Sequence, residues 1–317
     1  QGVAAHQRHF LEREFGKNRA DRLQPVMQEA YRLAYIRKPE FMGNTRTEEK
    51  DPKFKVISDL PWCEQEINER LAAYRQLSDK VEQEWHALPA QKKETYFQLV
   101  KYPVQAAAQM NNKLLTAQLA RHGKADWADS DRAYDSIVSL TKTYNTTKWN
   151  RMMDFQPRRL LVFNRVERKA LSSGLLEKPQ AVYTWNGADC VEGASVICEG
   201  LGYEGKAVAV EKKKELTFEF AAWETDSVEV EVRLLPNHPV EGERLRFTIS
   251  LDGSATEAVS YETKGRSEEW KENVLCNQAV RRMILPVARK ASHRLIFTAL
   301  DEGVVLDQIC LYMPRIK

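Results

Sequence analysis

The spacing of apolar residues changes once along this chain, near residue 174, and that change limits what the chain can fold into. Before it, apolar side chains recur every three or four positions, as on one face of a helix, most clearly in the series Ile67, Leu71, Tyr74, Val81 and Leu88. After it, apolar and charged residues alternate, as a half-buried strand requires. Four of the 14 glycines precede residue 174. The sequence therefore predicts two domains, a helical domain over 1–173 and a β domain over 174–317.

The first domain is predicted to be an antiparallel bundle of about five helices, because long apolar seams joined by short connections are typical of that architecture. The helices are expected at about 4–15, at about 19–37, after a cap at Ser58 or Asp59 with Pro61 in the first turn, from Pro89 onward, and at about 129–146. Pro103 lies inside the fourth pattern. We expect a kink there rather than an end, because the apolar period continues beyond it.

The second domain is predicted to be an antiparallel β-sandwich of about eight short strands separated by turns. Segment 228–234 alternates apolar and charged residues, and we expect Glu229 and Glu231 to face solvent. Asp252-Gly253 is a tight-turn signal at the end of another alternating segment. The segments that support this interpretation are 182–185, 207–210, 216–220, 228–234, 244–251, 293–300 and 304–311.

The composition excludes several classes of protein. The net charge of +3, from 48 basic and 45 acidic residues, argues against a nucleic-acid partner. No apolar run approaches the roughly 20 residues of a membrane span. The five cysteines form no CxxC pair, so we predict buried free thiols and no metal site, with Cys190 and Cys198 as possible neighbours on one hairpin. The glycines at 200, 202 and 205 have the wrong spacing for a dinucleotide-binding turn, and we predict no cofactor.

The acidic residues do not suggest a catalytic pair. Glycoside hydrolysis needs two carboxylates that flank a pocket, whereas the acids of this chain mostly occupy exposed helix positions or alternate along strands. Asp126, Asp129, Asp131 and Asp135 cluster around a helix start, where they favour the helix dipole. No carboxylate pair therefore stands out as catalytic.

One segment between the two domains mixes large and polar side chains without a helical or strand period. It covers 148–160 and includes Trp149, Asn150, Arg151 and Asp154. One interpretation is a packed crossing between domains, whose polar groups satisfy buried backbone. The other is a loop that presents polar groups to a ligand on a neighbouring domain.

Three tryptophans of the second domain are candidates for stacking on sugar rings. Trp185, Trp223 and Trp270 are each isolated in the sequence. Since the cores of sandwiches often contain tryptophan, a packing role is the simpler interpretation of each.

Short stretches in both domains occur in the order found in a known family. They read RKPE at 37–40, YFQLVKYPV at 96–104, AAAQMN at 106–111, KWNRMMD at 148–154, LLPNHP at 234–239, LRF at 245–247, SLDG at 250–253, Trp270 with NVL at 273–275, and DEGVVL at 301–306. On these stretches, the chain resembles the C-terminal half of glycoside hydrolase family 115, the xylan α-1,2-glucuronidases. Many relatives follow the Met-Met pair with a His-containing stretch, where this chain has FQPRR at 155–159.

The resemblance implies a non-catalytic accessory region. Members of the family carry an α/β domain and a catalytic (β/α)8 barrel ahead of the helical bundle and terminal sandwich. From the resemblance we expect these domains to support the barrel and the contacts of a homodimer, in an enzyme that removes (4-O-methyl)glucuronic acid side chains from xylan. The start at Gln1-Gly2 fits a processed protein or a segment of a longer polypeptide.

Two further expectations follow from the polymer substrate. The location would be periplasmic or extracellular, and a xylan-derived glycan is a candidate ligand. The alternative function is a stand-alone carbohydrate-binding protein that uses the sandwich.

Overall fold

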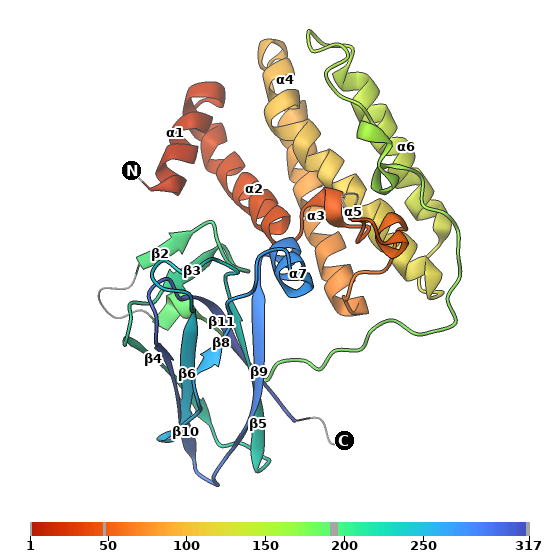
Figure 1. Ribbon diagram of the computed structural model, residues 1–317. Helices are drawn as coiled ribbons and strands as arrows, with labels where there is room; N and C mark the ends of the chain where they lie inside the picture. The colour runs from red at the N-terminus through yellow and green to blue at the C-terminus, as the bar shows by residue number, and fades with distance from the viewer. Residues whose placement is uncertain (1, 47–48, 191–195, 315–317) are drawn as a thin grey trace. The chain divides into compact units, whose positions relative to one another are not determined.

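The computed structural model describes residues 2–46, 49–190 and 196–314, with backbone alone for Arg158. It divides into two compact units, Val3–Lys178 and Pro179–Lys317, which are called unit 1 and unit 2 below (Figure 1). The boundary expected between residues 173 and 174 lies in an extended segment that precedes the observed one.

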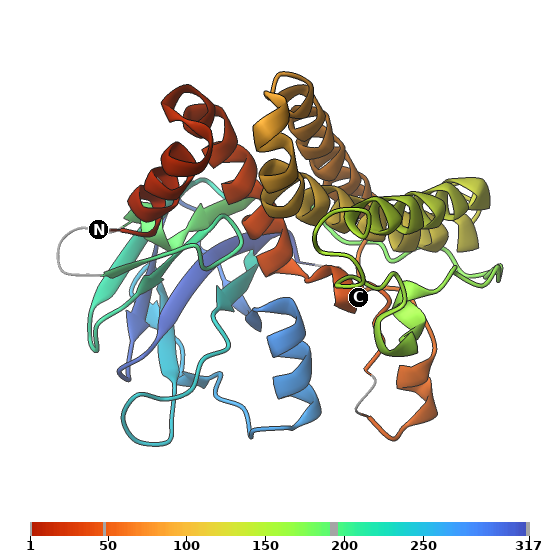
Figure 2. The same ribbon diagram turned by 90° about the horizontal axis from the view of Figure 1, so that it is seen from above.

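Unit 1 is the predicted helical bundle. Its neighbouring helices α5 and α6 lie side by side in both views (Figures 1 and 2). The buried residues Leu23, Tyr74, Val81, Tyr96 and Val104 belong to one of its core clusters. The α-helices of unit 1 are α1 (Val3–Phe15), α2 (Lys17–Ile36), α3 (Glu64–His86), α4 (Ala90–Tyr96), α5 (Tyr102–Arg121) and α6 (Trp127–Tyr144).

The start of α3 differs from the prediction. The helix begins at Glu64, and the side chain of Glu66 accepts a hydrogen bond from the N–H of Cys63 over 2.8 Å, so the expected cap at Ser58 or Asp59 is wrong. The preceding residues are held by Gln118 of α5. Its side chain accepts from the N–H of Leu60 over 3.0 Å and donates to the Leu60 carbonyl over 2.9 Å. This pairing keeps the segment non-helical despite its capping residues.

The fourth predicted helix is interrupted without ending. A π-helical segment, Phe97–Lys101, joins α4 to α5, and the N–H of Tyr102 bonds to the carbonyl of Phe97 five residues earlier. Pro103 follows immediately as the second residue of α5. A π segment shifts the hydrogen-bond pattern locally, which accommodates a residue that lacks an N–H. The chain therefore remains helical from Ala90 to Arg121, and the bundle has five helical rods.

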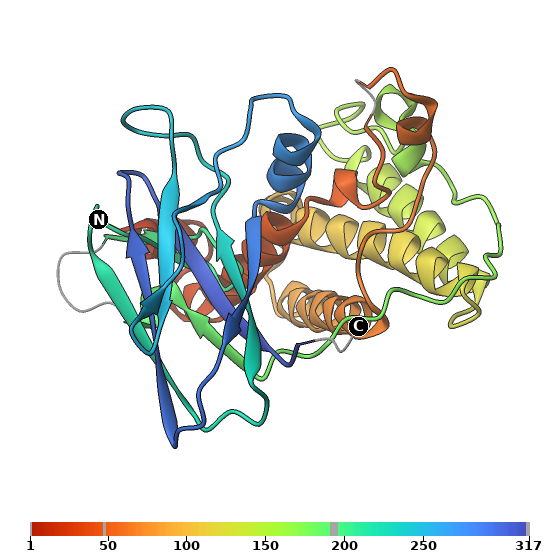
Figure 3. The same cartoon turned by 60° about the horizontal axis from the view of Figure 1, so that its bottom comes forward.

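Unit 2 is the predicted antiparallel sandwich, with two sheets that face each other (Figure 3). One sheet has the order β2-β3-β11-β5-β9, with β1 also paired to β11, and the other has the order β4-β10-β6-β7, with β8 paired to β6. The strands are β1 (Tyr183–Asn186), β2 (Val196–Glu199), β3 (Lys206–Ala209), β4 (Glu215–Ala221), β5 (Ser227–Leu234), β6 (Arg246–Leu251), β7 (Ser254–Ala255), β8 (Val259–Ser260), β9 (Ala279–Pro286), β10 (Ser292–Ala299) and β11 (Val305–Tyr312). The sequence patterns did not predict β2, β7, β8, β9 or the helix α7 (Glu268–Cys276).

A β-bulge in β11 decides which of its side chains enter the core. Leu306 pairs with Leu234 and Gln308 pairs with Arg233, so Asp307 is an extra residue with no partner of its own on β5. Without this bulge, strict alternation would place Gln308 on the core face with Leu306. The bulge reverses the alternation, so that the later apolar residues of β11 enter the core and Gln308 lies on the opposite face.

Two smaller features complete the fold. Across the part of the chain that the structure describes, no helix is both long and apolar enough to span a bilayer. The five cysteines are free thiols, but Cys310 is the one that is buried, and the other four are partly exposed.

Candidate functional site

The segment after α6 forms a tight loop that is held by one side chain. Asn145 donates from Nδ2 to the carbonyl of Met153 over 2.8 Å, and its Oδ1 accepts the N–H of Met153 over 3.3 Å. Within the loop, the N–H of Met152 donates to the carbonyl of Trp149 over 3.0 Å. Arg151 has a φ of 66°, in the left-handed region that few non-glycine residues adopt. The loop is therefore a defined turn between fixed ends.

Trp149 anchors this loop by packing. Its ring lies against a cluster formed by Phe97, Tyr102 and Tyr144, where Tyr102 and Tyr144 have ring centroids 4.8 Å apart. The Trp149 Nε1 is buried and finds no acceptor among the described residues. Trp149 is therefore a packed residue, as the first of the two interpretations of this segment expects.

The other candidates of the loop lie at the surface. Asn150, Arg151 and Asp154 are exposed, and Met152 between them is 64% exposed. Asp154 accepts the N–H of Gln156 at its Oδ1 over 3.0 Å, which fixes its carboxylate against the chain. A presenting role for these residues remains a proposal that the geometry allows.

The three tryptophans of unit 2 do not form one platform. Trp185 stacks on Tyr183 at 5.3 Å, and Phe220 joins Tyr183 to Trp223 in the same aromatic cluster inside the sandwich. Trp223 is 7% exposed and its indole N–H donates to the carbonyl of Ser227 over 2.9 Å, so this ring is part of the core. Trp270 lies apart from them on α7 and is half-buried.

A network of charged and polar side chains covers the face of the β2-β3-β11-β5-β9 sheet that points away from the sandwich core. Arg233 of β5 donates to Glu231 over 2.7 Å, to Gln308 over 2.8 Å and to the hydroxyl of Tyr312 over 3.2 Å. Arg282 of β9 donates to the second carboxylate oxygen of Glu231 over 2.7 Å. The network links three adjacent strands.

The expectation that Glu231 faces solvent is therefore wrong. Its side chain points away from the core as predicted, but it is 3% exposed. Burial by itself disfavours ionisation, and the two arginines outweigh it, so the pKa of Glu231 lies below its ordinary value. The alternating pattern identified the face of the strand correctly. It could not identify Arg233 and Arg282 as partners, because that pairing depends on the register of three strands.

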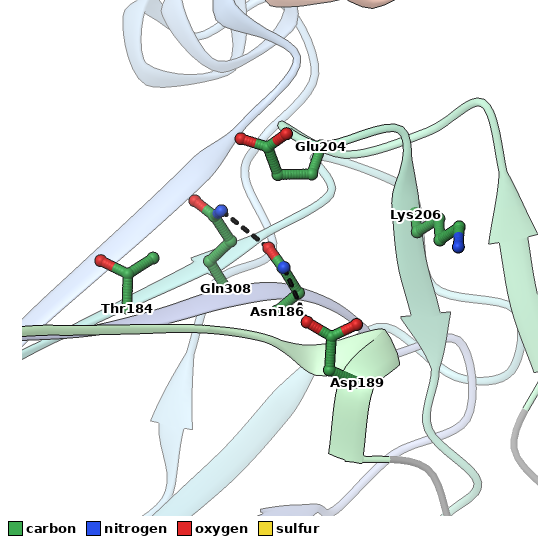
Figure 4. A pocket seen from close by; sticks show the side chains of 6 residues that line it. All are labelled: Thr184, Asn186, Asp189, Glu204, Lys206 and Gln308. Atoms are coloured by element: carbon green, nitrogen blue, oxygen red, sulfur yellow. Dashed lines mark hydrogen bonds between the residues drawn. The ribbon is translucent and has the colours of Figure 1, made fainter.

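The network ends in a pocket where β11 changes its neighbour. β3 pairs with β11 at Val305 and Leu306, and β1 takes over this edge of β11 at Gln308, which pairs with Asn186. Between the two neighbours lies a cavity of about 370 Å³ that is open to solvent. Its lining is polar and comes from β1, the turn after β1, the β2–β3 turn, β3 and β11 (Figure 4): Thr184, Asn186, Asp189, Glu204, Lys206 and Gln308.

Hydrogen bonds hold the amides of this pocket in place. Gln308 donates from Nε2 to Oδ1 of Asn186 over 2.9 Å, and Asn186 donates from Nδ2 to Asp189 over 2.8 Å. Figure 4 shows the three side chains in one row, with Glu204 on another side of the cavity. Since Arg233 donates to Oε1 of Gln308, the orientation of the whole row is set from the charged network.

Close backbone packing positions Asp189. The short 3₁₀ turn Gly187–Cys190 follows β1, and a Cβ on Gly187 would lie 2.9 Å from a methyl group of Val208 and 3.0 Å from the carbonyl oxygen of Leu306. Glycine is therefore required for the turn to lie this close to the sheet. The turn carries Asp189 to the cavity.

The β2–β3 turn, which carries Glu204, is fixed by the bulged residue of β11. Both carboxylate oxygens of Asp307 accept the N–H of Tyr203 over 3.0 Å, and one accepts from Gln278 over 3.2 Å. Asp307 is 1% exposed, and burial raises the pKa of its carboxyl group. Gly202 has a φ of 89°, and a Cβ there would lie 2.5 Å from the Asp307 carboxylate. Gly202 thus allows the turn to pack closely against Asp307.

A buried histidine–carboxylate contact elsewhere in unit 2 has a structural role. His293 is 2% exposed, stacks on Phe220 and contacts Asp252 through Nδ1 over 2.8 Å. The second oxygen of Asp252 accepts the N–H of Arg294 over 3.0 Å. Burial opposes ionisation of Asp252, but these hydrogen bonds prevail and lower its pKa. The contact fastens the turn after β6 to β10.

Comparison with known proteins identifies relatives of both units. Residues 194–317 match the model of the glycosyl hydrolase family 115 C-terminal domain. Among solved structures, the chain is similar to a family GH115 4-O-methyl-alpha-glucuronidase with specificity for decorated arabinogalactans, at 60% identity and a TM-score of 0.95. That match covers 99% of this chain and 42% of the solved chain. No curated protein matches the sequence.

A more distant likeness concerns one part of the chain. A carbohydrate binding module from Cellvibrio mixtus lichenase 5A, solved with cellotriose, matches at 12% identity and a TM-score of 0.34, over 43% of this chain and 100% of that one. A family 35 carbohydrate binding module from Clostridium thermocellum matches at 10% identity and a TM-score of 0.33, over 42% of this chain and 98% of that one. Likenesses this weak carry no argument about ligands.

Proposed function

This chain belongs to glycoside hydrolase family 115 as a C-terminal bundle-and-sandwich portion, and we propose that it is the non-catalytic accessory region of an enzyme that removes (4-O-methyl)glucuronic acid side chains from a polysaccharide. The observation that carries the proposal is the coverage. The chain is matched almost throughout, yet it spans 42% of the solved family member. The catalytic (β/α)8 barrel then belongs to the remainder of the polypeptide, as the family resemblance implies.

Two structural roles form the finer part of the proposal. The bundle and sandwich support the barrel, and they contribute to the contacts of a homodimer. The two large hydrophobic cores fit a supporting role, because each unit can fold around its own buried residues.

The polysaccharide is the least defined part of the proposal. The family resemblance points to glucuronoxylan, whereas the solved relative at 60% identity is described as specific for decorated arabinogalactans. Since that relative is a 4-O-methyl-alpha-glucuronidase, both polymers belong in the assay. Because the substrate is a polymer, we also propose that the enzyme acts in the periplasm or outside the cell.

The first experiment measures uronic acid release from both polymers by the purified 317-residue chain, after circular dichroism confirms that it is folded. The proposal predicts no release from the chain alone, and release from a longer polypeptide that includes the upstream barrel. Release by the 317 residues alone would overturn it, because the catalytic groups would then lie within this chain. Light scattering on the same samples tests the dimer, and a monomeric longer polypeptide would refute that part.

The loop after α6 is the proposed contact with the rest of the enzyme or its substrate. Because Asn150 and Arg151 are exposed on a turn with fixed ends, Arg151→Ala in the longer polypeptide is expected to raise KM and to weaken the salt dependence of kcat/KM. Lys142→Ala on α6 is the matched control, since Lys142 is an exposed cation of the same unit. Identical kinetics for wild type and both variants would count against a role for this loop.

The alternative from the sequence, a carbohydrate-binding protein that uses the sandwich, is favoured by one observation, the polar pocket of unit 2. Of the three tryptophans, Trp270 remains the candidate for sugar stacking, because Trp223 is in the core and Trp185 packs inside the sandwich. Quenching of tryptophan fluorescence by xylan oligosaccharides in wild type, but not in Trp270→Phe, would support it. Equal quenching in both proteins would refute sugar stacking by Trp270.

A further inference from the structure

The pocket beside Gln308 holds hydrogen-bond donors in fixed positions. Arg233 donates to Oε1 of Gln308, so the NH₂ group of Gln308 faces Asn186, and the NH₂ group of Asn186 faces Asp189. A side-chain amide nitrogen carries two hydrogens. Within the described residues, the row uses one hydrogen of each amide. The second hydrogen of each amide therefore remains for a ligand in the cavity that Gln308 and Asn186 line.

The rest of the lining supplies acceptors and little net charge. Asp189 and Glu204 contribute carboxylates, Lys206 an ammonium group and Thr184 a hydroxyl, which gives the lining a formal charge of −1. Such a set suits a ligand that donates and accepts hydrogen bonds at closely spaced points, which is the chemistry of adjacent sugar hydroxyls. From this arrangement we infer that the pocket of unit 2 binds a neutral pyranose sugar.

A uronic acid is a poorer fit to the same pocket. Its carboxylate would lie near two carboxylates of the lining, and one ammonium group cannot balance both. The pocket is therefore expected to discriminate by charge, and to prefer the neutral sugars of a polysaccharide over its acidic side chains.

A divalent cation is also disfavoured, although two carboxylates and two amides line the cavity. The amide oxygens that a cation would need already accept hydrogen bonds, Oε1 of Gln308 from Arg233 and Oδ1 of Asn186 from Gln308. The ammonium group of Lys206 adds repulsion. In the described part of the chain, no group of three or more His, Cys, Asp or Glu residues has the arrangement of a metal site. The amide hydrogens that the row leaves over select oxygen acceptors rather than cations.

The shape of the pocket sets the expected affinity. The cavity of about 370 Å³ is open to solvent, and the six side chains that line it include no aromatic ring. Without stacking or full enclosure, a single sugar residue is expected to bind with a Kd of about 1–10 mM. This inference rests on the alternative function proposed above, carbohydrate binding by the sandwich, and it can fail while the accessory role stands.

The test is a titration of the full 317-residue chain, followed by the side-chain amide resonances of Asn186 and Gln308 in nitrogen-15 NMR spectra. The probes are the methyl β-pyranosides of galactose, xylose and glucose, with methyl β-glucuronide as the charged comparison. At least one neutral probe is expected to give a saturable shift of both resonances, with a Kd at least about fivefold lower than that of the glucuronide. Calcium chloride is titrated separately.

Two variants and a control separate binding from folding. Asp189→Ala removes an acceptor and Thr184→Val removes a hydroxyl, and each is expected to weaken sugar binding about tenfold or more. Glu219→Gln, an exposed position on β4 of the other sheet, is expected to leave it unchanged. Backbone spectra of β11 confirm the fold of every variant. Three results would each overturn the inference: no saturable shift at about 50 mM of any neutral probe, tighter binding of the glucuronide, or a shift by calcium at concentrations where no sugar binds.

Discussion

Replacing Glu231 by Gln is expected to destabilise unit 2 by about 3 kcal/mol at pH 7, because it leaves a buried arginine without its counter-charge. The carboxylate of Glu231 lies 2.7 Å from Arg233 and 2.6 Å from Arg282. The side chain of Arg282 is 62% exposed, so water can solvate its charge, whereas the side chain of Arg233 is 21% exposed and is solvated much less. Removing one partner of a buried ion pair costs about 3–5 kcal/mol. The lower end applies because Arg233 keeps Gln308 and Tyr312 as acceptors.

Hydrogen exchange read by mass spectrometry on the whole chain gives the local free energy of opening. Peptides from β5 and β11 report the change, and peptides from α5 of unit 1 serve as an internal reference whose exchange rates should not change. Glu229→Gln is the matched control, on the same face of the same strand. Its contact with Arg282 is 3.9 Å long, and Arg282 is largely exposed, so the expected loss is below about 1 kcal/mol.

The same substitution changes the response to acid. The pKa of Glu231 is below its ordinary value of 4.5 in the fold, so the unfolded chain binds its proton first as the pH falls. The stabilisation is thus complete above about pH 4.5 and is lost progressively below it. Glu231→Gln should remove this part of the acid sensitivity. A loss at pH 7 no larger than that of Glu229→Gln, or an unchanged acid response, would refute the reasoning.

Three further predictions concern other parts of the chain. Gly187→Ala should lower the free energy of unfolding of unit 2, measured in urea, by about 1–3 kcal/mol, because the new Cβ would lie 2.9 Å from Val208. The control Gly265→Ala, whose Cβ would meet nothing within 4 Å, should leave the stability unchanged. Equal effects of the two substitutions would contradict the packing argument. Burial lowers the pKa of Lys113 to about 7 from 10.5, so the unfolded chain holds this proton over a pH range in which the folded chain does not. The free energy of unfolding of unit 1 should therefore rise between pH 7 and pH 9 by up to about 1.4 kcal/mol per pH unit. Lys113→Met should abolish that rise, and a rise that persists in the variant would disprove this assignment to Lys113. Asn145→Ala should speed proteolysis of the loop at 149–153 severalfold, since both hydrogen bonds to its backbone are lost, whereas the exposed Asn150→Ala should not.

The overall architecture was predictable because it depends on patterns that persist over many residues. The three-and-four period of 67–88 and the alternation of 228–234 each repeat often enough to outweigh local exceptions. Features that depend on a single distant contact were not predictable. The start of α3 is one of them: Ser58 and Asp59 have capping side chains, but the amide of Gln118 holds the adjacent backbone extended.

The candidate site shows the same limit at the level of side chains. The loop after α6 stood out in the sequence because Trp149 and polar residues occur together without a period, and the structure does place them on one turn. The pocket of unit 2 gave no comparable signal, since Asn186 and Asp189 lie more than a hundred positions before Gln308. Strand register brings Asn186 to Gln308, and the turn after β1 adds Asp189.

The bulge at Asp307 is the step that connects the fold of unit 2 to its pocket. By adding one residue to β11, it turns Gln308 out of the core and onto the face where Arg233 fixes its amide. Asp307 itself also contributes to the pocket, because its buried carboxylate binds the backbone of the β2–β3 turn that carries Glu204. Two walls of the cavity therefore depend on one extra residue in one strand. In physical terms the pocket is a consequence of the bulge, and the sequence did not reveal it because the bulge is defined by how β11 pairs with β5, which no pattern within β11 alone specifies.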